Sequence, residues 1–277
     1  MENKKKSKSS KYILIAISLI FVFFMLVLPL AVVVFYSLEK GVKTYLTAVT
    51  DVYTIKALQL TILATVLAVL VNTVFGLFAA WAITKFRFRG KQLLTTIIDI
   101  PFAMSPVIAG LLFSLTFGRL SPIYPFLSAH NIKIVFAVPG IVLATIFVTF
   151  PFVSREIIPV LNAQGTDEEE AAALMGAKGF HIFWKITFPH MKWAFLYGII
   201  LCTARAMGEF GAVSVISGHL RGKTNTLPLH VEILNNEFKL TEAFAVSSIL
   251  VILAVIILIL RNIVEYKAKK VGGEDVR

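Results

Sequence analysis

The stretch that decides the fold is YILIAISLIFVFFMLVLPLAVVVFYSL, residues 12–38, which contains no charged side chain. About 20 consecutive apolar residues are enough to carry a helix across the roughly 30 Å hydrocarbon core of a membrane. The run is too long for the apolar part of a signal peptide, which spans about 7–15 residues, and no small-residue cleavage pattern follows it. We therefore expect an uncleaved transmembrane helix at 13–38, preceded by a cytoplasmic tail at 1–12.

The whole chain has the same character. Of its 277 residues 57% are hydrophobic, and its mean hydropathy is +0.83, whereas soluble domains are typically about 45–50% apolar. A soluble fold could not bury so many long apolar helices. We expect an all-α polytopic membrane protein with a membrane domain at 57–262 and a cytoplasmic tail at 263–277. Its about six transmembrane helices are predicted at 13–37, 57–84, 95–117, 134–153, 194–216 and 242–262.

The basic residues indicate how these helices are oriented. The formal net charge is +11, but the lysines and arginines lie between apolar runs, as expected for lipid headgroups and topology rather than for nucleic acid. Most of the 27 fall in the two tails and in the segments 85–91 and 154–193. The positive-inside rule places these segments in the cytoplasm, and both termini with them. The only cysteine, Cys202, cannot form an intrachain disulfide.

The longest cytoplasmic segment, 154–193, has the pattern of a structured loop. Thr166 and Glu169 have the spacing of a capping box and predict the start of a short helix, which Gly176 would end. A second short helix is predicted by the 3–4 spacing of Phe180, Phe183, Trp184 and Thr187, which fall on one face. Aromatic side chains on that face favour a docking surface, and the alternative is a helix that lies on lipid.

This loop resembles the cytoplasmic signature of ABC-importer permease subunits, Glu-Ala-Ala, three residues, Gly, nine residues, Ile, one residue, Leu-Pro. The chain has every spacing and differs only at Phe188, where leucine is usual. In the family this loop fits a cleft in a separate ATPase subunit and transmits its movement. The resemblance thus implies an ATPase-coupling role for Glu170, Ala171, Ala172, Gly176, Ile186 and Pro189, and the predicted docking face adds Phe183 and Trp184 to this set.

Further segments resemble permeases of sulfate and thiosulfate importers, namely 85–91, 147–152, 204–213 and 217–228. The resemblance implies a type I ABC importer permease fold with a coupling-helix loop in the cytoplasmic membrane of a prokaryote. It implies a second homologous permease subunit, a cytosolic ABC ATPase dimer and an extracytoplasmic sulfate-binding protein as partners. The chain itself would bind no cofactor and would not be an enzyme, since ATP and Mg are used by the ATPase. Molybdate and tungstate permeases are similar and remain an alternative.

Two groups of residues are candidates for the substrate path. Arg205 lies near the middle of the predicted span 194–216, and Glu209 follows it at i,i+4. Arg205 either offers fixed positive charge to a passing dianion or is neutralised by Glu209 in a contact that fixes helix packing. The outer loop supplies the second group, His219, Arg221, Lys223, Thr224 and Asn225. These residues suit a mouth that receives an anion or a surface for a binding protein, and a solvated loop is the plain alternative.

Other kinds of function find little support in the pattern. The segment 218–224 resembles a phosphate-binding loop but has three residues between its glycines where the motif needs four. HExxH and CxxC motifs are missing, and no metal site is expected. An ion-gradient secondary transporter would favour an inverted repeat, which is not visible. A membrane receptor or scaffold would not need the spacing of the coupling signature.

Overall fold

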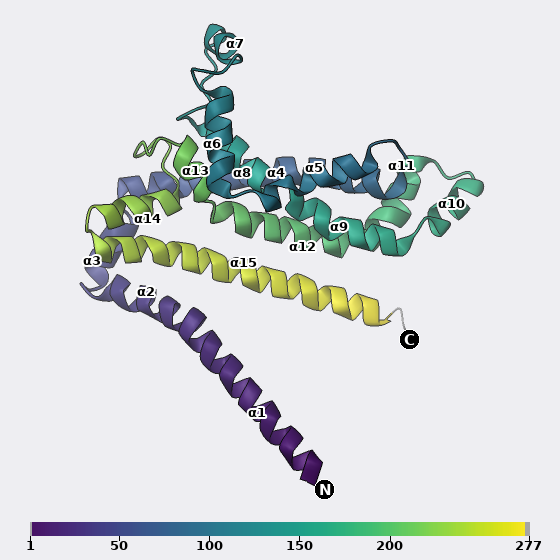
Figure 1. The fold of residues 1–277 in the computed structure, drawn as a ribbon, viewed down its shortest axis with the longest axis horizontal. Coiled ribbons are helices and arrows are strands. Elements are labelled where there is room, and N and C mark those ends of the chain that lie inside the picture. The colour runs from purple at the N-terminus through teal and green to yellow at the C-terminus, as the bar shows by residue number, and fades with distance from the viewer. Residues whose placement is uncertain (1, 275–277) are drawn as a thin grey trace.

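The computed structural model describes residues 2–274, and of their side chains those of 11–268, and throughout this part the regular elements are helices (Figure 1). The N-terminal part begins with a long helix that contains a π-helical turn. Its elements are α1 (Glu2–Val22), η1 (Phe23–Val27), α2 (Leu28–Leu38), α3 (Val42–Val49), α4 (Val52–Lys85), α5 (Lys91–Ala103), α6 (Pro106–Phe117) and α7 (Tyr124–Ala129).

The C-terminal part has a second π-helical turn among short helices. Its elements are α8 (Val138–Thr149), α9 (Pro151–Gln164), α10 (Asp167–Leu174), α11 (Gly179–Ile182), η2 (Phe183–Thr187), α12 (Phe188–Met207), α13 (Gly211–Ile216), α14 (Leu227–Asn236) and α15 (Leu240–Glu274). In Figure 1, α10 and α11 lie at one end of the bundle, and α3 and α14 lie at the other.

The expected all-helical membrane architecture is confirmed, but the count of six spans is not. Within residues 2–274, four stretches are long and apolar enough to cross a membrane: Lys11–Leu38, Val52–Lys85, Val138–Gln164 and Leu240–Ala268. The predicted span 95–117 is a pair of helices, α5 and α6, bent by 110°, which makes a fifth span only if the pair crosses as one. Pro106 begins α6 and disfavours helical backbone at the residue before it, so the chain turns there.

The predicted span 194–216 also differs from the structure. Here α12 ends at Met207, and α13 begins at Gly211 after a break. The two predicted tails are helical as far as they are described, since α1 starts at Glu2 and α15 runs to Glu274. Residues 1 and 275–277 of those tails lie outside the described part. No helix-breaking proline separates either tail from its apolar run, so the helices continue.

The centre of the bundle is α4, which packs against α8, α9 and α12 and touches α14. Small residues form a buried stripe along α4 at helical spacing: Ala57, Thr61, Ala64, Ala68, Gly76 and Ala80. Small side chains let membrane helices approach closely. Asn72, on the same stripe, donates to the Ile146 carbonyl at 3.1 Å and to Thr149 Oγ1 at 2.8 Å. These hydrogen bonds satisfy polar groups that lipid could not.

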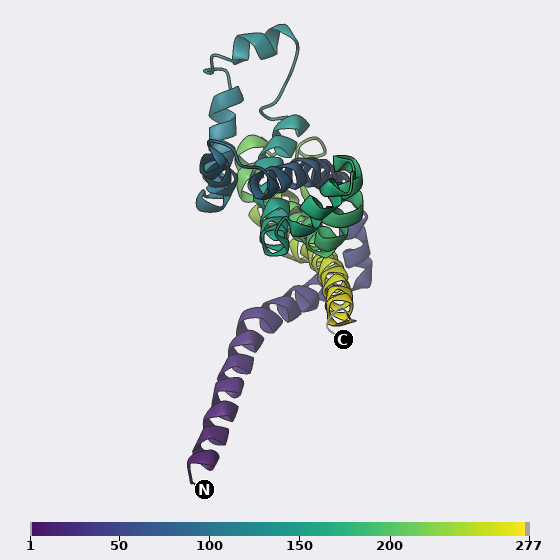
Figure 2. The ribbon, with the colours of Figure 1, turned by 90° about the vertical axis from the view of Figure 1, so that its right-hand side faces the viewer.

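Two parts of the chain extend away from this bundle (Figures 1 and 2). The first helix leaves it at α2, where Tyr36 stacks on Phe244 of α15 at 5.3 Å. Most side chains described for α1 and α2 are exposed and apolar, as expected of a surface that meets lipid. The second part is an arm formed by α6, α7 and the turn between them, which carries the exposed apolar side chains of Leu120 and Phe126.

Candidate functional site

The segment from α10 to η2, residues 167–187, forms a compact projection that we call the coupling knob. Gly176 ends α10 as the sequence predicts, with a left-handed φ of +86°. Ala177 N–H donates to the Ala172 carbonyl and Gly176 N–H to that of Ala173, each at 3.0 Å. These two bonds are the Schellman motif, which favours glycine at this position because a Cβ atom strains the left-handed backbone. Gly176 therefore sets the angle between the two halves of the coupling knob.

The tip of the coupling knob is apolar and exposed. Leu174 is 90% and Met175 86% exposed, and Phe180 and Trp184 are exposed beside them. The prediction that Phe180, Phe183, Trp184 and Thr187 share one face is wrong. Phe183 packs on the bundle core and Thr187 is buried. The second half of the knob contains the π-helical turn η2, in which Phe188 N–H donates to the Phe183 carbonyl, and this wider turn changes the angular spacing of the side chains.

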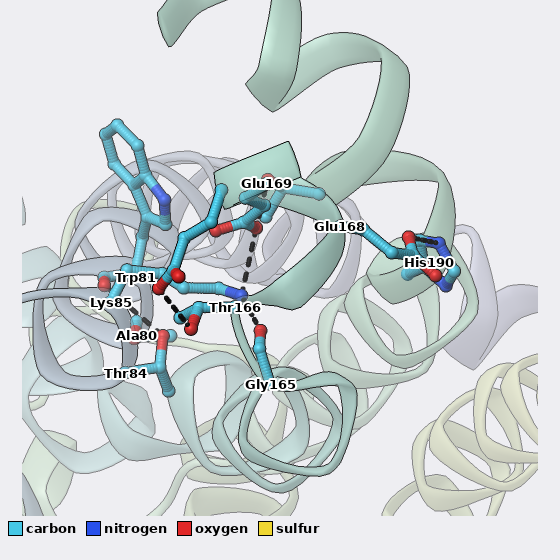
Figure 3. Close-up of polar contacts among 11 residues, drawn as sticks. Ala80, Trp81, Thr84, Lys85, Gly165, Thr166, Glu168, Glu169 and His190 are labelled. Carbon is cyan, nitrogen blue, oxygen red and sulfur yellow. Dashed lines mark hydrogen bonds and ion pairs between the residues drawn. The ribbon is translucent and has the colours of Figure 1, made fainter. Parts of the chain in front are cut away.

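A buried ion pair joins the coupling knob to the bundle (Figure 3). Lys85 Nζ lies 2.9 Å from Glu169 Oε1, and the two side chains are 6% and 15% exposed. The same ammonium donates to the Gly165 carbonyl at 2.6 Å. Thr187 Oγ1 donates to Glu169 Oε1, also at 2.6 Å. One lysine and one carboxylate thus connect α4, the end of α9, α10 and η2.

The neighbouring acidic residues are arranged differently from the prediction. Thr166 and Glu169 have the spacing of a capping box but do not form one, because the Glu169 carboxylate turns to Lys85 and Thr187. Thr166 Oγ1 instead donates to Glu170 Oε1 at 2.8 Å. Of the family signature, Glu170, Ala171, Gly176 and Pro189 are exposed. Glu170, the residue after Glu169, is therefore exposed on the surface of the coupling knob.

Arg205 and Glu209 meet at the break between α12 and α13. Arg205 Nη1 lies 2.6 Å from Glu209 Oε2, and their side chains are 32% and 1% exposed. Glu209 Oε1 accepts from the Ala212 N–H at 2.8 Å, in the first turn of α13. One carboxylate oxygen thus pairs with Arg205, and the other accepts a hydrogen bond from the first turn of α13. Ala212 also lies against α6, where a Cβ atom on Gly110 would come within 2.3 Å of the Ala212 carbonyl oxygen.

The segment 217–240, which the sequence predicts to face outward and which we call the outer segment, is less open than the sequence suggests. His219 Nε2 lies 3.2 Å from Glu232 Oε2, and Arg221 pairs with Glu237. Hydrogen bonds from Arg221 and Lys239 lower the pKa of Glu237 to about 2. Thr224 and Asn225 were expected at an open mouth but are buried. Thr224 Oγ1 donates to the Ser217 carbonyl at 2.6 Å, so it supports the turn, and of the five candidates only Lys223 is exposed.

Within residues 2–274, no three of the His, Cys, Asp and Glu residues are grouped so that they could hold a metal ion. Comparison with known proteins indicates a transport protein. Residues 72–272 match the family described as the binding-protein-dependent transport system inner membrane component. The chain belongs to this family. As members of the family are permease subunits, the ATPase is a separate protein and this subunit is not an enzyme.

Among relatives of this permease, the sulfate transport system permease protein CysW of Synechocystis sp. is 44% identical over 96% of both chains. CysW of Escherichia coli K12 is also 44% identical, over 93% of this chain and 88% of the relative. CysT of Salmonella typhimurium is 37% identical, over 89% of this chain and 88% of the relative. The resemblance to the sulfate permeases is thereby confirmed.

A solved structure has the same fold. It is a chain of a bacterial ABC transporter involved in the import of alginate, with a TM-score of 0.78 and 15% sequence identity. The match covers 97% of this permease and 98% of that chain. A second structure, of the bacterial alginate ABC transporter in complex with a pentasaccharide-bound periplasmic protein, gives a TM-score of 0.77 at 15% identity. Identity this low supports the fold alone, which is that of a type I ABC importer permease.

The sequence interpretation missed the part that Lys85 plays. Lys85, the last residue of a long apolar helix, was used as a topology signal and as part of the segment 85–91 that resembles sulfate permeases, and no contact was predicted for it. No local pattern shows that the first turn of α10 lies against the end of α4, because the two are separated by more than 80 residues. The one available signal was an excess of carboxylates, Asp167 to Glu170, beyond those that helix capping needs.

Proposed function

We propose that the chain is the pore-forming permease subunit of an ATP-driven importer of sulfate or thiosulfate. The observation that carries this proposal is the 44% identity to sulfate permeases along nearly the whole chain, since the match includes both membrane helices and loops. The polar contacts inside the helix bundle, at Asn72 and between Arg205 and Glu209, hold helices together. The energy for transport then comes from the partner ATPase.

A cytosolic ATPase dimer is proposed to bind the coupling knob. Leu174, Met175, Phe180 and Trp184 are large apolar side chains that are exposed at the end of the bundle where α10 and α11 lie. Exposed apolar patches rimmed by polar residues mark interaction surfaces. Asp167, Glu168 and Glu170 form such a rim at the start of α10. A cleft with an apolar floor and a basic edge in the ATPase would fit this surface.

Two further partners are proposed. The similarity to both CysW and CysT favours a pore formed by two homologous permease subunits. The α6–α7 arm projects sideways from the bundle and exposes Leu120 and Phe126, so it offers a surface for that second subunit. An extracytoplasmic sulfate-binding protein would deliver the anion. Lys223, which is exposed, and His219 and Arg221, which are partly exposed, would meet it at the outer segment.

The proposed orientation places both termini and the coupling knob in the cytoplasm and the outer segment 217–240 outside. The basis is the uneven distribution of Lys and Arg. A cysteine introduced at Lys267 is expected to react with a membrane-impermeant thiol reagent only after the membrane is opened, and one at Lys223 without opening. Because the native Cys202 is buried, it gives little background. Labelling of the Lys223 site only in opened membranes would contradict the orientation.

Sulfate uptake tests the function directly. In cells that lack their own sulfate permeases, this chain expressed with a second permease subunit, an ATPase and a sulfate-binding protein is expected to restore uptake of radiolabelled sulfate. Gly176→Val is expected to reduce uptake to near background, because a β-branched residue strains a φ of +86° and would change the angle of the coupling knob. The ATPase should co-purify with the wild type and not with this variant.

Gly179→Ala is the matched control, since the added Cβ meets nothing within 4 Å and the backbone needs no positive φ. A Gly176→Val protein that is inserted, keeps its ATPase and transports at the wild-type rate would contradict the role of the knob. Adding excess molybdate or tungstate to the assay tests the alternative that the permease transports these anions. Uptake of molybdate in preference to sulfate would replace the proposed substrate and leave the permease assignment unchanged.

A further inference from the structure

The buried pair Lys85–Glu169 lies at the only ion-paired junction that the described residues show between the coupling knob and α4. We propose that Lys85 and Glu169 are positioning residues that transmit movement of the coupling knob to α4, and through α4 to the outer segment 217–240. This inference rests on the proposed function. It assigns a role to two residues outside the residues that the coupling signature names.

The pair connects four segments of the chain, α4, the end of α9, α10 and η2, at one point. Lys85 Nζ binds both Glu169 Oε1 and the Gly165 carbonyl, so the last turn of α4 is fixed to α10 and to the end of α9. Thr187 Oγ1 fixes the same carboxylate to η2. Both halves of the coupling knob are therefore connected to the end of α4. Figure 3 shows Lys85, Gly165 and Glu169 converging there.

Burial makes this connection stiff. A surface ion pair exchanges readily with water and contributes little, whereas separating a buried pair leaves charges without solvation. The side chains of Lys85 and Glu169 are 6% and 15% exposed, in contrast to the exposed pair that Glu168 of the knob makes with His190 of α12. An aromatic contact runs beside the pair, since Trp81 of α4 meets Phe183 of η2 edge-on at 5.3 Å. Rotation of the knob must either carry α4 along or break both contacts.

The other end of α4 reaches the outer segment. With 34 residues, α4 is about 50 Å long at 1.5 Å per residue, enough to connect both sides of a membrane. Thr54 Oγ1, in its first turn, lies 3.2 Å from His230 Nε2. Thr61 Oγ1 accepts from the Leu227 N–H at 2.7 Å. One continuous helix thus touches the coupling knob at Lys85 and the α14 region at Thr54 and Thr61.

The test separates coupling from folding by removing both charges together. Lys85→Met alone is expected to lower the amount of inserted protein, because it leaves the Glu169 carboxylate buried without a counter-charge. Lys85→Met with Glu169→Gln leaves no unpaired charge and should be inserted at nearly the wild-type level, with the ATPase bound. With the complex reconstituted in closed vesicles and supplied with binding protein, sulfate transported per ATP hydrolysed should nonetheless fall by roughly fivefold to tenfold, within the usual range of coupling between sites. The matched control is Arg155→Met with Asp99→Asn, which removes an exposed pair outside the knob.

A second measurement needs no substrate. In a Lys223→Cys background, the rate at which a thiol reagent outside the membrane labels the introduced cysteine should change on addition of ATP. This change should disappear in the double variant. A double variant that transports with the wild-type ratio, or keeps the ATP-dependent labelling change, overturns the inference, since the pair would then be structural only. If the wild type shows the labelling change without sulfate uptake, the proposed substrate fails and the inference stands. A wild type with neither response overturns both.

Discussion

Gly110→Ala is expected to prevent the protein from accumulating in the membrane, although it adds a single methyl group. In a helix interior, replacing glycine by alanine is normally favourable by about 0.5–1 kcal/mol. At Gly110 in α6 the new Cβ would lie 2.3 Å from the Ala212 carbonyl oxygen and 2.9 Å from its Cα. Both are backbone atoms, so no rotamer change relieves the clash and α6 must separate from α13. We expect a loss of at least about 3 kcal/mol, the upper part of the range for overpacking.

The measurement is the amount of detergent-extracted protein and its thermal stability by size-exclusion chromatography. Gly208→Ala is the matched control, because its Cβ would meet only the Ala204 carbonyl oxygen, at 3.8 Å. It should behave as the wild type. Ala212→Gly should not rescue Gly110→Ala, since the clash involves backbone atoms that every residue has. Normal stability of Gly110→Ala would mean that α6 does not cross α13 this closely.

Arg205→Met is expected to destabilise the protein because it leaves Glu209 buried without a counter-charge. Removing one partner of a fully buried pair costs about 3–5 kcal/mol, and we expect roughly 2–3 here because Arg205 is one-third exposed. Arg205→Met with Glu209→Gln should recover most of the loss, since a glutamine oxygen can still accept from the Ala212 N–H. Thermal stability and the amount of inserted protein measure both effects.

The same substitution at an exposed pair is the control. Arg155 lies 2.8 Å from Asp99, but their side chains are 50% and 38% exposed, so Arg155→Met should cost no more than about 1 kcal/mol. The experiment also decides between the two interpretations of Arg205. An Arg205→Met protein that is as stable as the wild type and has lost only transport would assign Arg205 to the anion path rather than to helix packing.

The sequence alone determined the class of the protein, because local properties decide it. The run 12–38 and the apolar runs after it can be stable only as membrane helices, and a backbone without water must satisfy its own hydrogen bonds. The end of α10 at Gly176 was predictable for the same reason, since its left-handed backbone depends on the residue type at one position. The coupling signature is equally local, as its residues lie in one short segment.

Helix continuity was determined less well. Hydropathy places a span at 95–117 but does not show that the chain bends by 110° between α5 and α6. Hydropathy likewise predicts one continuous span at 194–216, whereas in the structure the helix ends at Met207. Apolar composition reports only that a segment avoids water. Whether that segment stays straight depends on what packs beside it, such as α13 against α6 at Gly110.

Only the tertiary structure decided which polar residues meet. Thr166 and Glu169 have the spacing of a local cap, yet Glu169 pairs with Lys85, because a buried ammonium needs a carboxylate more than an exposed helix end needs a cap. Thr224 and Asn225 have residue types that are typical of an open loop, yet both are buried. For Thr224, the Ser217 carbonyl replaces the water. Sequence spacing measures distance along the chain, whereas desolvation and pairing depend on residues brought together from far apart in it.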